Sequence, residues 1–184
     1  MRTLTLSKSG TSKVRSHLWE LKQSDFEEPL KSLTPGEWCI FTGGASLNWL
    51  GFVNPLLDAK YSCANVVSEF TKDDNLSPED IIKLKISKAF KRRLRFKEYE
   101  GGSRIFYGAS DGLPGLIIDK FENALVIQIN TAGIDRYREM IKDFVQNLTK
   151  TTSYFLDNQK YREKESLPFF ETTPLPELYI ILSN

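Results

Sequence analysis

The chain has 184 residues, of which 40% are hydrophobic and 27% charged, which is typical of a globular protein and not of a disordered or fibrous one. Its apolar runs fall far short of the ~20 residues that cross a bilayer, and its start lacks the apolar stretch of a secretory signal, so we expect a cytoplasmic protein with no membrane contact. Two cysteines and one histidine exclude a disulfide framework and a Cys- or His-based metal cage.

The net charge of +1 hides an uneven distribution along the chain. Residues 1–22 carry five basic side chains against one acid, and residues 23–82 carry ten acids against three lysines. Residues 83–97 then hold eight Lys or Arg side chains and no acid. This segregation creates local fields of either sign and suits an anionic partner held on one face.

The first seventy residues read as a small β-rich unit, because β-branched and aromatic residues cluster between Gly, Pro, Asn and Asp turn signals. A short helix is expected around residues 13–18. The expected strands are 2–6, 37–42, 49–53 and 64–70.

A polar segment at residues 71–77 separates this unit from a long helix. Ser77 is a candidate N-cap, followed by a first-turn proline and two acids at the positive helix end. The helix is expected over residues 78–99. Its apolar face, at spacings of three and four, consists of Ile82, Ile86, Ala89, Phe90 and Leu94.

The remainder, residues 103–184, alternates strands with one amphipathic helix, which is expected over residues 134–148 and needs a sheet to cover its apolar stripe. The chain shows no internal repeat. The expected strands are 103–107, 116–119, 124–130, 153–157, 161–165 and 178–182.

Enzyme motifs are missing from the sequence. It has no glycine-rich phosphate loop, no G-x-S-x-G elbow, no H-E-x-x-H and no C-x-x-C. Gly43-Gly44 and Gly101-Gly102 are isolated pairs, so we expect no catalytic residue and no cofactor site in this chain. Cys39 and Cys63 have apolar neighbours and are expected to be buried, unreactive thiols.

The basic run at residues 83–97 favours a phosphate-binding role, because eight like charges on one helix repel each other unless a partner neutralises them. The alternative is that this helix pairs with acids elsewhere in the fold. The amino-terminal basic set is a weaker form of the same pattern, and His17 within it is more often a packing or capping residue. The candidate RNA-contacting residues are Lys13, Arg15, His17, Lys91, Arg92, Arg93, Arg95 and Arg104.

A second candidate is a run of turn formers, in which two glycines permit positive φ and proline fixes its own φ. We expect this run to have a mainly structural role, because its aspartate is the only residue with a side chain that could act in binding or catalysis. The run consists of Asp111, Gly112, Leu113, Pro114 and Gly115.

The stretch from Arg104 to Phe121 closely resembles the R-l-v-x-G-E-s-D-G-L-P-G-l-i-v-D-r-Y motif of the PUA-containing ribosomal-RNA cytosine-5 methyltransferases. Shorter similarities agree in order: His17-Leu18-Trp19 with H-P-W, Gly51 to Pro55 with G-x-y-N-P, Leu125 to Gln128 with l-V-i-Q, and Arg162 to Glu165 with v-R-x-x-E-G. The sequence departs from that pattern at Ala109, Leu18 and Ser166.

The resemblance implies an α+β protein: a PUA-like, β-rich barrel over residues 1–70, a linker over 71–77, and a small α/β (EEHEE-like) domain over 78–184 with a mixed sheet and two main helices. It also implies an S-adenosylmethionine-dependent enzyme whose Rossmann-type catalytic domain would begin about where this chain ends, at Asn184. We therefore expect recognition of structured, ribosomal RNA without catalysis.

Two alternatives stay open. The chain could be a free-standing RNA-binding protein that lacks a catalytic domain, or a module that binds an acidic protein surface. The sequence also leaves the oligomeric state open, a dimer included.

Overall fold

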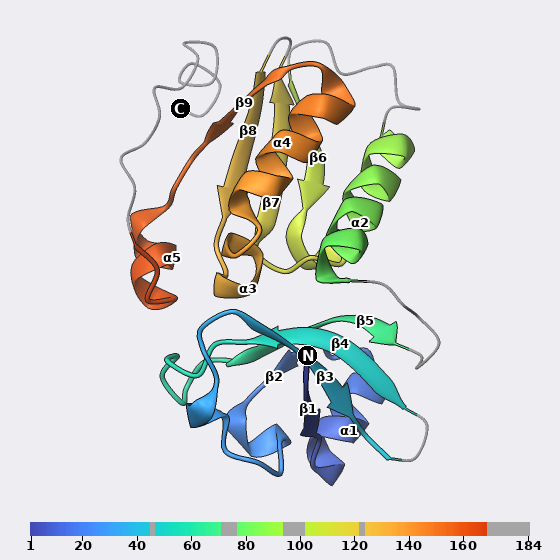
Figure 1. Ribbon diagram of the computed structural model, residues 1–184, viewed down its shortest axis with the longest axis vertical. Coiled ribbons are helices and arrows are strands. Elements are labelled where there is room, and N and C mark those ends of the chain that lie inside the picture. Colours follow the sequence, from blue (N-terminus) through green and yellow to red (C-terminus); the bar gives the residue numbers. More distant parts are fainter. Residues whose placement is uncertain (45–46, 71–76, 94–101, 122–123, 169–184) are drawn as a thin grey trace.

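The computed structural model describes residues 1–44, 47–70, 77–93, 102–121 and 124–168. These residues form two sheets, one above the other in Figure 1. We call the part built on the first sheet, residues 1–70, the N-terminal unit, and the part built on the second, residues 77–168, the C-terminal unit. The predicted linker 71–77 lies outside the described residues except for Ser77.

The N-terminal unit is a five-stranded sheet of order β1-β3-β4-β5-β2, in which only β1 and β3 are parallel. No ladder joins β1 to β2 among the described residues, so the expected barrel is an open sheet here. Its elements are β1 (Arg2–Thr5), α1 (Lys8–Arg15), β2 (Glu20–Leu21), η1 (Gln23–Asp25), η2 (Leu30–Ser32), β3 (Glu37–Thr42), β4 (Asn48–Val53) and β5 (Ala64–Phe70).

The helix expected at residues 13–18 is wrong in position. Helix α1 begins after Ser7, whose side chain accepts a hydrogen bond from the Gly10 backbone N–H, and it ends at Arg15. His17 follows with φ +60°, a left-handed backbone that ends the helix. Serine is a preferred N-cap residue, so Ser7 was a usable sequence signal for the true start of this helix.

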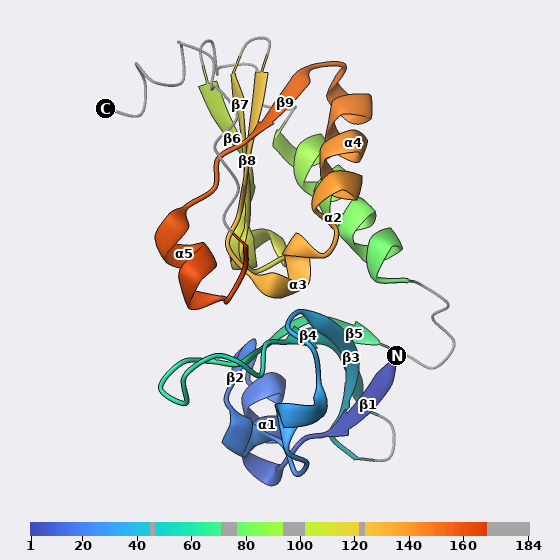
Figure 2. The same ribbon diagram turned by 60° about the vertical axis from the view of Figure 1, so that its left-hand side comes forward.

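The C-terminal unit is a four-stranded mixed sheet of order β6-β7-β8-β9, in which β8 and β9 are parallel. Figure 2 shows α2 and α4, the two main helices, on one side of this sheet and α5 on the other. The expected α+β class is confirmed. The elements are α2 (Pro78–Arg93), β6 (Gly102–Tyr107), η3 (Gly108–Asp111), β7 (Leu116–Phe121), β8 (Ala124–Ile129), α3 (Ala132–Asp135), α4 (Arg138–Thr149), β9 (Thr152–Phe155) and α5 (Gln159–Lys164).

Helix α2 begins as its sequence predicts. Ser77 Oγ accepts the Asp80 N–H at 3.2 Å, and the Asp80 carboxylate accepts the Ser77 N–H at 3.0 Å, which completes a reciprocal cap. Ile82, Ile86, Ala89 and Phe90 are buried against the sheet. The expected continuation to residue 99, with Leu94, lies outside the described residues.

The strand expected at residues 161–165 is wrong, because these residues belong to helix α5 and the turn after it. Asn158 caps the helix by accepting the Tyr161 N–H at 3.2 Å. The segment contains no β-branched residue, and the four residues after Tyr161 are good helix formers, so its composition already favoured a helix. The strand expected at 178–182 lies outside the described residues.

The two units share one hydrophobic cluster. Trp38, Phe52 and Val67 of the N-terminal unit pack in the same cluster as the core of the C-terminal unit. The Trp38 indole N–H donates to the Gly133 carbonyl at 2.9 Å. A Cβ on Gly133 would lie 2.0 Å from the Phe52 ring, so only glycine permits this close approach. An apolar contact of this kind holds the units in a fixed arrangement.

Candidate functional site

The turn at residues 111–115 has the predicted backbone. Gly112 and Gly115 have φ of 84° and 90°, and Leu113 is fully buried beneath them. A Cβ on Gly112 would lie 2.6 Å from the Lys85 ammonium nitrogen of helix α2. Burial lowers the pKa of Lys85, and the nearby Lys88 lowers it further. The turn therefore packs tightly against the basic helix.

Asp111 connects this turn to the end of helix α2. Its carboxylate, only 2% exposed, accepts hydrogen bonds from both Arg92 and Arg93, with 2.7 Å to Arg93, and from the Tyr107 backbone N–H at 2.7 Å. We call Asp111, Arg92 and Arg93 the Asp111 clamp. The alternative noted for the basic run, pairing with an acid elsewhere in the fold, holds for these two arginines.

The other three candidate RNA-contacting residues of the C-terminal unit, Arg104, Lys91 and Arg95, are not found together in the described structure. Arg104 forms a two-pronged ion pair with Asp119, at 2.8 and 3.0 Å, and lies over the Tyr107 ring at 5.1 Å. Lys91 is exposed on α2. Arg95 lies outside the described residues. The structure thus does not gather these side chains into one described surface.

In the N-terminal basic set, Lys13 is bound to Asp25. The ammonium contacts both carboxylate oxygens at 2.7–2.8 Å, and the aspartate is buried. Burial would raise the pKa of Asp25, but hydrogen bonds from Lys13 and the Lys22 N–H outweigh it and lower the pKa below 3.8. Arg15 and His17 are exposed, and the His17 ring lies 6.0 Å from the Trp19 ring.

Helix α1 forms one wall of a groove of about 580 Å³. We call it the α1 groove. Lys8 and Arg15 supply positive charge, and Glu27 is the single acid among its described lining residues. The remaining lining residues are mostly hydroxyl side chains and a glycine pair: Thr5, Leu6, Thr11, Ser12, Ser16, Gly43 and Gly44.

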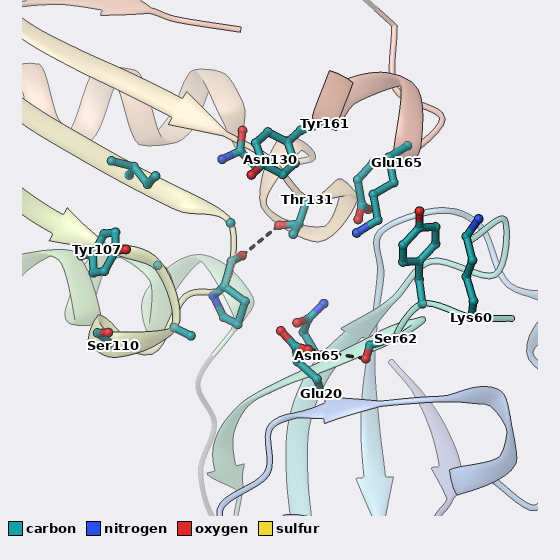
Figure 3. Close-up of a pocket in the computed structure, with 17 residues that line it drawn as sticks. Glu20, Lys60, Ser62, Asn65, Tyr107, Ser110, Asn130, Thr131, Tyr161 and Glu165 are labelled. Atoms are coloured by element: carbon teal, nitrogen blue, oxygen red, sulfur yellow. Dashed lines mark hydrogen bonds between the residues drawn. The ribbon is translucent and has the colours of Figure 1, made fainter. Parts of the chain in front are cut away.

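A larger cavity, about 770 Å³, lies between the two units and is shown in Figure 3. We call it the inter-unit cavity. Glu20, Ser62 and Asn65 face it from the N-terminal unit, and Tyr107, Asn130 and Tyr161 from the C-terminal unit (Figure 3). Gly108, Ala109, Ser110, Pro114 and Gly115 of the turn region also line it. The turn is visible in the sequence but the cavity is not, because the cavity walls come from segments far apart in the chain.

Glu165 and Asn54 lock the units together beside this cavity. The Asn54 amide donates to the Glu165 carboxylate at 2.9 Å and to its backbone carbonyl at 3.0 Å, and the Ala132 N–H donates to the same carboxylate at 3.0 Å. Both side chains are buried. They belong to two of the sequence similarities noted above, G-x-y-N-P and v-R-x-x-E-G, which are therefore joined in space.

Arg162 has a similar structural task. It is fully buried, pairs with Asp135 at 2.8 Å and donates to the Pro168 carbonyl at 2.6 Å. Arg138 pairs with Asp157 at 2.8 and 2.9 Å in the same network. Removing one member of such a buried set leaves a charge without its partner, so these residues fix α5 and the end of β9.

The cysteines are buried, as predicted. Burial raises the pKa of each thiol to about 11; the charge of Glu37 adds to the effect at Cys39, and a backbone hydrogen bond partly offsets it at Cys63. Neither is an activated nucleophile. The described part of the chain holds no cluster of His, Cys, Asp or Glu that could ligate a metal ion, and no helix there has the length and hydropathy of a membrane span.

The chain is 41% identical over 68 residues to the ribosomal RNA large subunit methyltransferase I of Yersinia pseudotuberculosis, and equally to that of Yersinia pestis. Over that stretch the chain is homologous to this methyltransferase. The stretch covers 36% of the chain but only 17% of the Yersinia proteins. No protein-family model matches the chain.

Two solved structures share its fold. A provisionally assigned SAM-dependent methyltransferase from Streptococcus mutans superposes with a TM-score of 0.68 over 96% of this chain, at 12% identity. A provisionally assigned methyltransferase in complex with SAH gives a TM-score of 0.69 at the same identity. The chain spans less than half of either protein, 45% and 44%.

The described residues do not fit the S-adenosylmethionine site of a Rossmann-type domain. Such a site needs a glycine-rich turn between a parallel strand and a helix, with strands connected by right-handed crossovers. Gly43 and Gly44 instead follow β3 and precede its antiparallel partner β4. Of the described strands that belong to a parallel pair, β1 leads into α1, β8 into α3 and β9 into α5, and none of these connections contains a glycine. We therefore derive no catalytic step from these residues.

Proposed function

We propose that this chain binds ribosomal RNA and is the RNA-recognition part of a SAM-dependent ribosomal RNA methyltransferase. The observation that carries the proposal is the 41% identity to a ribosomal RNA methyltransferase over 68 residues. The fold shared with two methyltransferase structures, of which this chain spans less than half, supports a division of labour between recognition and catalysis.

The α1 groove is the surface best suited to the RNA backbone. Lys8 and Arg15 can each neutralise a phosphate, and the hydroxyls of Thr11 and Ser12 can donate to phosphate oxygens. A Cβ on Gly44 would meet nothing within 4 Å, so backbone is open to a close approach there. Arg15 has no ion-pair partner among the described residues, so it needs no rearrangement before it binds.

The finer assignments belong to the same proposal. The N-terminal unit would act as a PUA-like domain, and the C-terminal unit as an EEHEE-like recognition domain. Cytosine-5 would be the target, S-adenosylmethionine would bind in a further domain of a longer protein, and the enzyme would work in the cytoplasm. The motif from Arg104 to Phe121 supports the family assignment.

The two alternative functions that the sequence left open can be distinguished from this proposal. A free-standing RNA-binding protein would use the same groove, so the length of the natural reading frame distinguishes it. The alternative of a module that binds acidic proteins depended on the basic run at residues 83–97. Arg92 and Arg93 of that run are already paired with Asp111 in the clamp, which weakens this alternative.

The test is the affinity for a ribosomal RNA stem-loop over a salt series. We expect wild-type affinity to fall steeply with salt. The double variant Lys8→Gln, Arg15→Gln should reduce the log-log slope by about 1.4–1.8, at ~0.7–0.9 per lost phosphate contact.

The matched control, Lys31→Gln with Lys150→Gln, removes the same charge from exposed positions outside the groove and should leave the slope within about 0.3 of wild type. A flat salt dependence, or a preference for a polyacidic protein over RNA, contradicts the proposal.

A further inference from the structure

The exposed aromatic side chains of the described residues all line one cavity. Among the described residues, three Tyr, Phe or Trp side chains are exposed: Tyr61 at 37%, Tyr107 at 51% and Tyr161 at 47%. All three line the inter-unit cavity. They come from the loop before β5, the end of β6 and helix α5, so neither sequence proximity nor a common element explains the grouping.

Neighbouring groups hold two of the tyrosines, Tyr61 and Tyr107, in place. The Tyr107 N–H donates to Asp111, and Arg104 covers its ring at 5.1 Å. The Tyr61 ring lies beneath the ammonium groups of Lys164, at 4.2 Å, and Lys60, at 5.0 Å. These two rings are thus positioned before any ligand arrives, which lowers the entropic cost of binding a flat partner.

The polar lining favours a neutral ligand over a run of phosphates. Lys60 and Lys164 are balanced by Glu20 and Glu165, and Glu165 is already bound by Asn54 and Ala132. The amides of Asn65 and Asn130 and the hydroxyl of Ser110 also line the cavity. The Asn130 Oδ1 is buried without a hydrogen-bond partner among the described residues. Amides and hydroxyls of this kind can bond to the edges of a base.

We infer that the inter-unit cavity holds one or two unstacked bases of single-stranded RNA, stacked on Tyr61, Tyr107 or Tyr161. This inference rests on the proposed function and adds a second contact, to bases, beside the backbone contact of the α1 groove. The volume of 770 Å³ lies within the ~300–1,000 Å³ of ligand sites. Every base has a π-face, so aromatic walls whose neighbouring charges balance suit bases without a fixed sequence.

The experiment compares two RNA octamers that carry the same phosphates. One is oligouridine, whose bases stack weakly on each other, and the other has the same backbone with abasic sugars at every position. Wild-type protein should bind oligouridine about 5- to 150-fold more tightly than the abasic octamer, the range expected for one base on an aromatic ring.

The triple variant Tyr61→Ala, Tyr107→Ala, Tyr161→Ala should lose most of the preference for oligouridine, because the stacking surface is gone and only the polar contacts to base edges remain. The triple Phe variant at the same positions should keep the preference for oligouridine. Leu84→Ala with Leu148→Ala, which removes exposed apolar side chains outside the cavity, should also keep it. Thermal unfolding of each variant checks that it folds.

The outcomes separate this inference from the proposed function. Lys8→Gln with Arg15→Gln should weaken binding of both octamers by the same factor. Equal wild-type affinity for the two octamers, or an intact preference in the triple Ala variant, overturns the inference while RNA binding by the groove stands. Displacement of the octamer by an equal concentration of uridine monophosphate also overturns it, since the cavity would then be a mononucleotide pocket. Failure to bind any RNA removes the proposed function itself.

Discussion

Helix α1 and the end of helix α2 are both basic in sequence, yet their charges meet different surroundings. At the end of α2, Arg92 and Arg93 share the buried carboxylate of Asp111. On α1, Lys13 is bound to Asp25, whereas Arg15 is exposed at the groove. A basic run thus contains some side chains that form structural ion pairs and others that are free to bind a ligand. The position of a buried acid decides which side chains are paired.

The largest effect is expected when Asp111, the acid that Arg92 and Arg93 share, is removed. Asp111→Ala should lower the free energy of unfolding by about 2–4 kcal/mol, because two arginines lose their counter-charge and the Tyr107 N–H loses its acceptor. Denaturant unfolding measures it. A loss below about 0.5 kcal/mol would show that the clamp is an incidental surface pair.

A smaller effect is expected from the arginine side of the clamp. Arg93→Gln should cost about 1–2 kcal/mol, since its guanidinium is largely buried and donates to the buried Asp111 carboxylate at 2.7 Å. Its RNA affinity should match wild type. Lys91→Gln, an exposed neighbour on the same helix, is the control and should stay within about 0.5 kcal/mol. Equal losses of unfolding free energy in the two variants would contradict the conclusion that Arg93 is a structural residue and Lys91 is not.

Parts of this picture follow from the sequence. The bounds of β3 and β5, the Ser77 cap and the apolar face of α2 through Phe90 depend on local spacing, and local spacing is visible in a sequence. The register of α1 and the helical state of α5 were also within reach of the sequence, because Ser7 and Asn158 are residue types that commonly cap helices.

The rest depends on contacts between distant segments. Asp111 meets Arg92 across 19 positions, and Asn54 meets Glu165 across 111. Nothing in the local sequence of Arg92 distinguishes it from Arg15, although one is clamped and the other lies at a groove. The inter-unit cavity was not predictable for the same reason, because Tyr61, Tyr107 and Tyr161 come together only in the fold.

The smallest expected effect concerns pH and the ion pair beneath α1. The folded pKa of Asp25 lies below its ordinary value of 3.8, so the pair stabilises the fold above pH 3.8, and the contribution is lost as the pH falls through the lower folded value. Asp25→Asn should remove this part of the acid sensitivity. The change should be about 1 kcal/mol or less, because Lys13 is a third exposed. Unfolding curves between pH 2 and pH 6 measure it, and identical pH profiles for variant and wild type would contradict the assignment.

The most direct test compares the two arginines themselves. A dicarbonyl reagent modifies accessible guanidinium groups, and mass spectrometry can follow Arg15 and Arg92 in one sample with and without a ribosomal RNA stem-loop. Our account predicts that RNA slows the modification of Arg15 and leaves the rate at Arg92 unchanged. Protection of Arg92 with no change at Arg15 would contradict it and would move the RNA surface to helix α2.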